Sequence, residues 1–137
     1  MTNSERAARN EFNPSVDLRA RNSSMFDLTG LFVHIIGCGA IGSFTASTLA
    51  RMGVTSFDLL DPDIVAPENI GVQDFTYHQL GEYKVAAVKQ NILSLNPNAN
   101  VQISKIKVTS ESRHCFHALY DNDYWIRYST RNTFHKW

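Results

Sequence analysis

A glycine-rich segment between an apolar run and an amphipathic run constrains the fold of this chain more than any other feature. Residues 31–36 (LFVHII) are almost continuously apolar, which is typical of a strand buried on both faces of a parallel sheet. The sequence GCGAIG follows at positions 37–42 and matches the pattern G-x-G-x-x-G. Apolar residues then recur at helical spacing over residues 41–52, and Gly53 stands where a glycine commonly ends a helix. This order of strand, glycine turn and helix is the context that a phosphate-binding loop requires.

Each glycine of this motif has a separate expected role. Gly37 permits the tight turn, Gly39 lets the backbone approach a phosphate, and Gly42 lets the helix pack close to the strand. Backbone N–H groups and the positive end of the helix then favour an anionic ligand. The alternative is a glycine turn that serves packing alone.

The rest of the chain continues the alternation of strands and helices. Residues 56–60 and 101–108 predict two further strands, and residues 82–95 and 111–119 predict two further helices. A long loop over residues 61–81 precedes the helix at 82–95. We therefore expect an α/β fold, a Rossmann-like three-layer domain with a mainly parallel sheet, built as an incomplete βαβαβ half. In this sheet we expect residues 31–36 to be central, next to 57–60 and 101–108.

Composition and charge exclude several classes of protein. Thirteen Lys and Arg residues balance thirteen Asp and Glu residues, so a polybasic nucleic-acid-binding protein is not expected. The two cysteines, Cys38 and Cys115, form no CxxC pair, which argues against a disulfide framework and a cysteine zinc site. The N-terminal residues are polar and no apolar run approaches the roughly 18 residues of a membrane span. We therefore expect a cytoplasmic protein with neither a nucleic-acid nor a membrane partner.

An aspartate at the end of the second predicted strand adds to the evidence for a nucleotide. Asp61 stands 19 residues beyond Gly42, where a carboxylate commonly accepts hydrogen bonds from ribose hydroxyls. The sequence Asp61-Pro62-Asp63 also starts turns, which is the alternative explanation. These residues alone leave the ligand open between NAD, FAD, S-adenosylmethionine and ATP.

The long loop and its flanks resemble the ThiF/MoeB/HesA family, the bacterial relatives of ubiquitin-activating enzymes. The resemblance runs from about residue 33 to residue 108. It rests on the glycine motif, LLDPDIV at 59–65, ENI at 68–70, Gln73, GEYKV at 81–85 and LNP at 95–97. The glycine motif is weak by itself, but this ordered set at these spacings is much more specific.

The resemblance implies an adenylyltransferase that uses ATP and Mg²⁺ to activate the C-terminal carboxylate of a ubiquitin-like or sulfur-carrier protein. By position, Asn69 reaches the phosphate region and Lys84 neutralises charge as pyrophosphate departs; these two are the implied catalytic residues. Lys84 is otherwise an ordinary solvated lysine at a helix start. No metal-ligating residue is identified. The implied cofactor-binding residues are Gly37, Gly39, Ala40, Ile41, Gly42, Asp61, Asp63, Asn69 and Lys84.

The chain departs from the family pattern at three places. Val72 stands where the family motif Asn-Leu-x-Arg-Gln has the Arg that contacts the ATP phosphates. The N-terminal residues show no clear counterpart of the family's arginine-bearing arm, and residues 127–137 resemble nothing in the family. We therefore expect nucleotide binding with weak or absent turnover. The alternatives are a non-catalytic nucleotide-binding or interaction module and an NAD(P)-binding Rossmann protein.

Three segments and one mode of assembly complete the expectations. We expect a polar arm over residues 1–30, a nucleotide-binding domain over 31–126 and an atypical tail over 127–137. A half-domain exposes a sheet edge and an apolar face, so we expect a homo-oligomer. The expected partners are therefore a second copy of the chain and, as the family resemblance implies, the tail of a carrier protein.

Overall fold

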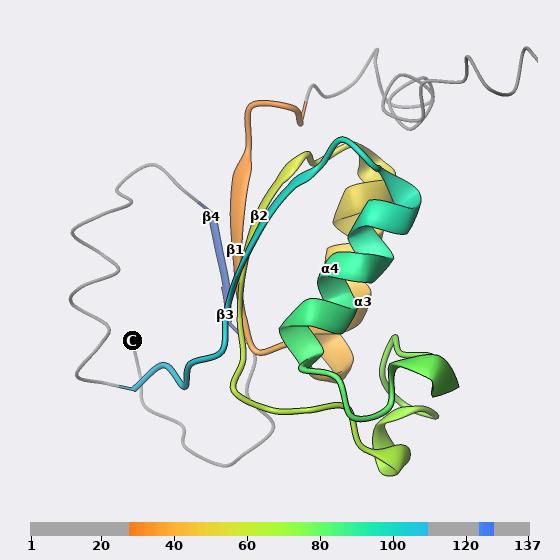
Figure 1. Cartoon of the computed structure of the whole chain (residues 1–137). Coiled ribbons are helices and arrows are strands. Elements are labelled where there is room, and N and C mark those ends of the chain that lie inside the picture. The colour runs from red at the N-terminus through yellow and green to blue at the C-terminus, as the bar shows by residue number, and fades with distance from the viewer. Residues whose placement is uncertain (1–27, 110–123, 128–137) are drawn as a thin grey trace, which may run out of the picture.

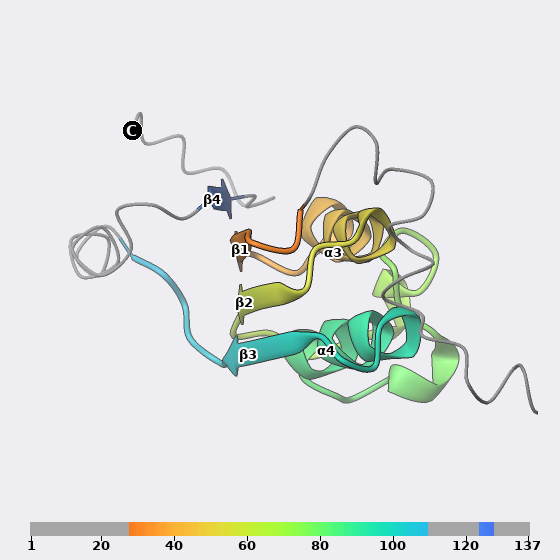
Figure 2. The same cartoon turned by 90° about the horizontal axis from the view of Figure 1, so that it is seen from above.

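The described part of the chain forms a parallel sheet with helices on one face. The computed structural model describes residues 28–109 and 124–127. Every strand pair within this part is parallel, and the strand order is β3-β2-β1-β4. Figures 1 and 2 show both helices packed against the same face of the sheet. The elements are β1 (Phe32–Ile36), α3 (Ala40–Met52), β2 (Ser56–Leu60), the 3-10 turns η1 (Pro67–Asn69) and η2 (Tyr77–Gln79), α4 (Lys84–Leu95), β3 (Asn100–Ser104) and β4 (Tyr124–Arg127).

The two faces of the sheet differ in what they bury. Val33 and Ile35 on β1 belong to one buried apolar cluster with Phe57 on β2 and with the inner faces of α3 and α4. The alternate residue of β1, His34, is fully buried and lies in register with Asp58 of β2. Their side chains form a hydrogen bond of 3.1 Å. The predicted α/β fold and the parallel pairing of the first two strands are confirmed.

The first helix ends as the sequence predicts. Gly53 has a φ of 107°, in the left-handed region that favours glycine. Its N–H donates to the Ala50 carbonyl, and the Val54 N–H donates to the Leu49 carbonyl at 3.0 Å. These bonds satisfy carbonyls that the helix leaves free at its C-terminus. The turn then directs the chain into β2, parallel to β1.

Of the two predicted neighbours of the first strand, the strand at 57–60 is correct and the strand at 101–108 is wrong. β3 pairs with β2, and β1 lies between β2 and β4. Both described crossovers place their helices on one face, so each adds the next strand on the same side of the sheet. β4 lies on the other side of β1, which makes the β1–β4 boundary a topological switch point.

Two predicted boundaries also differ from the structure. The strand predicted over 101–108 ends at Ser104, because β2 ends at its register partner Leu60 and offers no further pairing. The helix predicted from residue 82 begins at Lys84, because Tyr83 is still extended and forms a bridge with Ile64. The helix predicted over residues 111–119 lies outside the described residues. So do Cys115 and nearly all of the predicted arm and tail.

Close packing of α3 against the end of β1 depends on Gly42. A Cβ at this position would lie 1.8 Å from the Gly37 carbonyl oxygen and 3.3 Å from Ile35 Cγ2. The nearer atom belongs to the backbone, so the helix or the loop would have to move. The expected role of Gly42 in helix–strand packing is therefore confirmed.

We predict that Gly42→Ala lowers the free energy of unfolding by about 1–3 kcal/mol or more, the usual cost of overpacking a well-packed core. Urea denaturation followed by circular dichroism measures this change. Gly71→Ala is the matched control, because, its chain neighbours aside, no atom of the described residues lies within 4 Å of its Cβ position. Equal stability of the two variants would contradict the role given to Gly42.

Candidate functional site

The glycine loop lies at the carboxyl end of β1, at the switch point of the sheet. Gly37 has a φ of 95°, and its N–H donates to the Leu60 carbonyl at 2.8 Å, so it makes the tight turn expected of it. Gly39 is the N-cap of α3, and no side chain caps the helix there. No side chain at the cap position therefore accepts hydrogen bonds from the first N–H groups of α3. This is the usual arrangement at a helix end that binds an anion.

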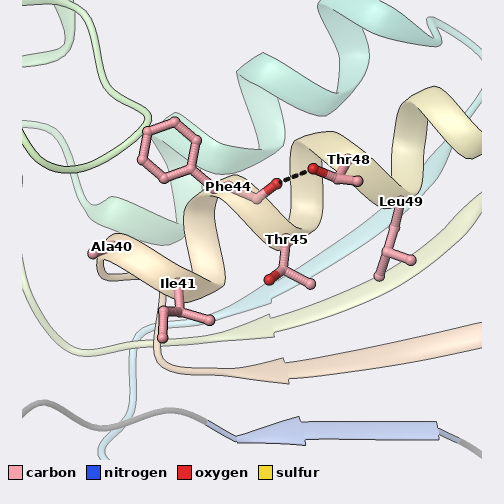
Figure 3. A pocket seen from close by; sticks show the side chains of 6 residues that line it. All are labelled: Ala40, Ile41, Phe44, Thr45, Thr48 and Leu49. Atoms are coloured by element: carbon pink, nitrogen blue, oxygen red, sulfur yellow. Dashed lines mark hydrogen bonds between the residues drawn. The ribbon is translucent and has the colours of Figure 1, made fainter.

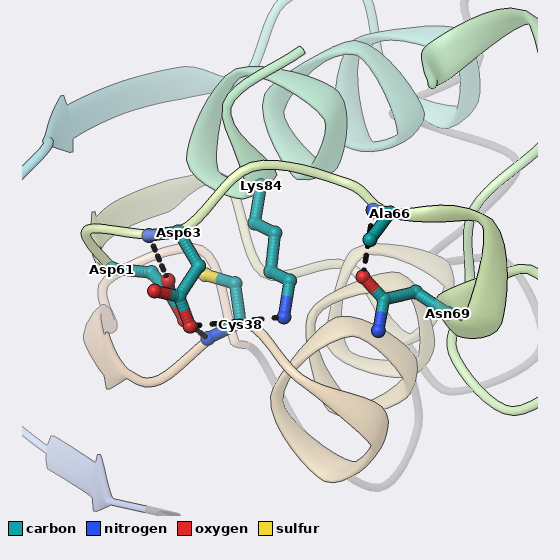
Figure 4. A network of polar contacts seen from close by, with 6 residues as sticks. All are labelled: Cys38, Asp61, Asp63, Ala66, Asn69 and Lys84. Atoms are coloured by element: carbon teal, nitrogen blue, oxygen red, sulfur yellow. Dashed lines mark hydrogen bonds and ion pairs between the residues drawn. The ribbon is translucent and has the colours of Figure 1, made fainter. Parts of the chain in front are cut away.

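Asp61 joins the glycine loop to the loop that follows β2 (Figure 4). Its Oδ2 accepts a hydrogen bond of 2.7 Å from the Cys38 N–H, and its Oδ1 accepts one of 2.8 Å from the Asp63 N–H. The side chain is buried. The turn-forming role considered for Asp61 is thus present in the structure, and each oxygen keeps a second lone pair for a ligand hydroxyl.

Lys84 brings a buried positive charge to the same place. It is the first residue of α4, and its N–H donates to the Asp63 carbonyl at 2.9 Å. Its side chain is 10% exposed, and its ammonium lies 4.0 Å from Asp63 Oδ2, whose own side chain is 55% exposed. This ion pair is long and partly solvated, and the positive end of α4 opposes a cation. The reading of Lys84 as an ordinary solvated lysine is wrong, because the side chain is buried.

Asn69 presents its amide to the site from the end of η1. Its Oδ1 accepts a hydrogen bond of 2.8 Å from the Ala66 N–H. Figure 4 shows the amide nitrogen on the side away from Ala66. The carbonyl end of the amide thus holds the loop, and the N–H₂ end is the part that can bind an acceptor.

Cys38 is fully buried inside the glycine loop. Burial raises the pKa of its thiol well above the ordinary range, the Asp61 carboxylate raises the pKa further, and Lys84 opposes these effects. The thiol therefore stays protonated at neutral pH and is a poor nucleophile. Burial and a protonated thiol are the properties of a cysteine that packs rather than reacts.

The loop between β2 and α4 is fastened to both helices. The Ser43 hydroxyl of α3 accepts a 3.0 Å hydrogen bond from the Asp74 N–H, and the Ser47 hydroxyl bonds the Asp74 carboxylate. From α4, the Asn91 amide donates to the Asp74 carbonyl at 2.7 Å. The same loop carries Gln73, whose Nε2 lies 4.0 Å from the Cβ position of Gly39.

The structure thus brings most of the predicted residues together. The glycine loop directly follows β1, and Figure 4 shows Asp61, Asp63, Asn69 and Lys84 grouped around its residue Cys38. Ala40 and Ile41 differ, because their side chains line an open groove of about 420 Å³ along α3 (Figure 3). Only their backbone N–H groups belong to the helix terminus. Gln73 and Asp74 were not predicted as site residues; the one available signal was the position of Gln73 in the family motif.

Asp61→Asn tests whether the carboxylate holds the two loops together. An Asn can accept only one of the two N–H bonds, and its own N–H₂ would face the other donor. We expect the free energy of unfolding to fall by about 1–3 kcal/mol, the cost of leaving a buried polar group unpaired. Urea titration measures the change. Asp63→Asn is the control and is expected to change stability by less than about 0.5 kcal/mol, because this side chain is exposed. An Asp61→Asn variant as stable as this control would refute the role.

Comparison with known proteins agrees with this geometry. The pattern of the ThiF family matches residues 18–124. The "ATP-dependent ubiquitin transferase-like protein Cap2" of Enterobacter hormaechei subsp. hoffmannii (strain UCI 50) is 30% identical over 106 residues, which cover 77% of this chain and 18% of that protein. Ubiquitin-like modifier-activating enzyme 5 of Gallus gallus is 33% identical over 78 residues, which cover 57% of this chain and 20% of the enzyme.

A solved structure shows the same fold. The E. coli tRNA N6-threonylcarbamoyladenosine dehydratase TcdA, crystallised in complex with AMP, aligns with a TM-score of 0.67 at 23% identity. The alignment covers 83% of this chain and 46% of TcdA. This chain therefore spans about a fifth of the two sequence relatives and about half of TcdA. Since the family pattern covers most of its residues, this chain belongs to the ThiF family.

Proposed function

We propose that this chain binds ATP at its glycine loop and contributes to adenylation of the C-terminal carboxylate of a ubiquitin-like or sulfur-carrier protein. One observation carries the proposal: a buried lysine ammonium lies at the start of α4 with only a 4.0 Å ion pair among the described residues. A buried cation whose one described ion pair is long and partly solvated is costly. A bound polyphosphate would supply a closer counter-charge.

The other residues fit a nucleotide. Gly39 leaves its backbone open to a close ligand, and the uncapped start of α3 offers N–H donors to phosphate oxygens. The Asn69 amide supplies a further donor, and Asp61 supplies lone pairs for ribose hydroxyls. The names of the relatives, and the complex of TcdA with AMP, support an adenine nucleotide over NAD(P).

The proposed reaction needs positioning and positive charge more than a protein base. The carrier carboxylate attacks the α-phosphorus of ATP, the bond from that phosphorus to the bridging oxygen breaks, and pyrophosphate leaves with the negative charge. Lys84 would hold the oxygens on which that charge accumulates, and the glycine loop would hold the phosphate chain in place. The product is an acyl-adenylate of the carrier.

The described residues do not account for a magnesium site. Within residues 28–109 and 124–127, no three His, Cys, Asp or Glu side chains gather into a group that could hold a metal ion. Asp63 is an exposed carboxylate that forms the 4.0 Å ion pair with Lys84. We assign no magnesium ligand and no step to the metal.

Partners and location belong to the proposal as well. We propose a second copy of the chain and a carrier-protein tail as partners, in the cytoplasm. Neither helix of the described residues has the length and apolar content needed to cross a bilayer.

Lys84→Met tests the role of the buried charge. We expect ATP affinity to fall at least about tenfold, because a charged hydrogen bond contributes roughly 1.5–3 kcal/mol. The free energy of unfolding should stay constant or rise by up to about 1 kcal/mol, since a cation at a helix N-terminus is unfavourable. Isothermal titration and urea denaturation measure the two quantities. Lys89→Met, on the same helix, should leave ATP affinity unchanged. Wild-type affinity for ATP in Lys84→Met would overturn the proposal.

Val72→Arg tests whether the departure from the family motif limits the reaction. Val72 is 62% exposed, so a longer side chain meets no packing obstacle in the described structure. We expect the new guanidinium to strengthen ATP binding by about tenfold and to raise ATP–pyrophosphate exchange in the presence of a carrier protein. Val72→Leu is the matched control.

The results of that experiment separate the remaining alternatives. An unchanged ATP affinity in Val72→Arg would show that position 72 does not face the phosphates. ATP binding without exchange in either form would favour the non-catalytic nucleotide-binding module. A preference for NAD over ATP would favour the NAD(P)-binding alternative.

A further inference from the structure

Residues 66–75, in the loop between β2 and α4, carry Asn69 and form one compact turn. The Asn69 carbonyl accepts hydrogen bonds from the N–H groups of Val72 and Gln73, at 3.3 and 2.9 Å. The Phe75 N–H donates to the Gln73 carbonyl at 2.8 Å. These bonds fix the shape of the turn, but they do not fix its place relative to the helices.

A single residue joins this turn to both helices by hydrogen bonds. The Asp74 N–H donates to the Ser43 hydroxyl of α3 at 3.0 Å, and the Asp74 carboxylate accepts from the Ser47 hydroxyl, about one helical turn further along α3. The Asp74 carbonyl accepts from the Asn91 amide of α4 at 2.7 Å. Among the described residues, every hydrogen bond between residues 66–75 and the two helices is one of these three.

The bond to Ser43 connects the turn with the start of α3. The Ser43 N–H donates to the Gly39 carbonyl at 2.9 Å and closes the first turn of the helix. The Ser43 hydroxyl accepts from Asp74 and donates to the Ala40 carbonyl at 3.4 Å. Ser43 and Ser47 are both buried, and a hydrogen bond away from water is electrostatically stronger than one at the surface. The position of the turn is therefore set against the same helix end that follows the glycine loop.

The side chain of Asp74 contributes as a hydrogen-bond acceptor. It is half-buried, and no Lys, Arg or His in the described part of the chain forms an ion pair with it. Its carboxylate instead accepts from the Ser47 hydroxyl. An amide oxygen can accept from a hydroxyl as well, so an Asn at this position would keep the bond without the charge.

We propose that Asp74 is a positioning residue for nucleotide binding: it holds the turn on α3 and thereby places the Asn69 amide at the start of that helix. The proposal rests on the proposed function, since it takes ATP as the ligand of the loop. Asp74 does not touch the ligand and acts on it through Asn69 alone. Small displacements of a binding group are enough to weaken its contact, so the hydrogen bonds of Asp74 determine how well Asn69 binds.

The experiment measures ATP affinity by isothermal titration in a double-mutant cycle. Asp74→Ala removes the side-chain bond to Ser47, and Asn69→Ala removes the amide through which Asp74 acts. We expect Asp74→Ala to weaken ATP binding by about three- to tenfold when Asn69 is present, which is the range of one hydrogen bond. In the Asn69→Ala background we expect the same substitution to change the affinity by less than about twofold. A general structural role would lower the affinity by the same factor in both backgrounds.

Two further variants separate the hydrogen bond from the charge. Ser47→Ala removes the donor of the same bond and is expected to weaken ATP binding by the same factor as Asp74→Ala. Asp74→Asn keeps an acceptor for Ser47 and should stay within about twofold of the wild-type affinity. Thr48→Ala is the matched control on α3, because the Thr48 hydroxyl donates to the Phe44 carbonyl of its own helix at 2.8 Å. This control should keep the wild-type affinity.

The outcomes distinguish this assignment from the proposed function. Equal losses in the two backgrounds, or wild-type ATP affinity in Asp74→Ala, would overturn the role of Asp74 and leave the proposed function standing. An Asp74→Asn variant that binds ATP as weakly as Asp74→Ala would overturn that role too. Failure of the wild-type chain to bind ATP would overturn both. If Asp74→Ala does not fold, as judged by circular dichroism, the same cycle with Ser47→Ala decides the question.

Discussion

The candidate site depends on the hydrogen bonds that the Asp61 carboxylate accepts. It accepts one hydrogen bond from the glycine loop after β1 and one from the loop after β2. Parallel strands bring their carboxyl ends to one edge of the sheet, but they do not by themselves fix the loops that leave it. A buried carboxylate with two backbone donors does so, because each bond to a charged acceptor is stronger than a neutral one. The turn at Gly37 and the start of α3 are thereby set relative to Asp63 and Lys84.

A second set of bonds fixes the loop that lies over the site. Asp74 donates its N–H to Ser43 of α3 and accepts at its carbonyl from Asn91 of α4. The buried Gln79 donates to the Ala87 carbonyl and to the Asn91 side chain. A loop of this length without such bonds would sample many conformations. Here its conformation is determined by α3 and α4, which pack against the same face of the sheet. Asn69 and Gln73 are consequently held over the glycine loop by the core of the domain.

The features that the sequence predicted correctly are those that a backbone requirement dictates locally. Gly37 and Gly53 have positive φ, and Gly42 leaves room for the Gly37 carbonyl. Each position favours glycine, so the requirement is visible in the sequence itself. The apolar runs predicted the strands, because the strands of a parallel sheet are buried. The end of β3 was missed because it depends on where β2 stops, and alternation within one strand carries no information about its neighbour.

The order of the strands and the role of the loop were harder to predict from the sequence, because they depend on contacts between residues far apart in the chain. That β3 pairs with β2 follows from the side on which each helix packs, which no local pattern specifies. The bond between Ser47 and Asp74 likewise joins residues far apart in the chain. Ser and Asp are common at surfaces and turns, so neither residue signalled this contact. The resemblance to a family predicted Asn69 and Lys84 through their positions, without the geometry that brings them together.

Two features that lower the stability of the fold lie at the same edge of the sheet. Lys84 is a buried cation at the positive end of α4, and Gln73 leaves one end of its amide buried without a described partner. Each is unfavourable for folding, on the order of 1–3 kcal/mol for the amide atom. A fold optimised for stability alone would replace both with apolar residues of similar size. Lys84 lies near the uncapped start of α3, where an anion accepting its hydrogen bonds would turn this cost into binding energy. The unpartnered Gln73 oxygen is itself an acceptor and gains nothing from an anion. The stability that this domain forgoes at Lys84 is therefore the physical argument for the phosphate ligand proposed at the glycine loop.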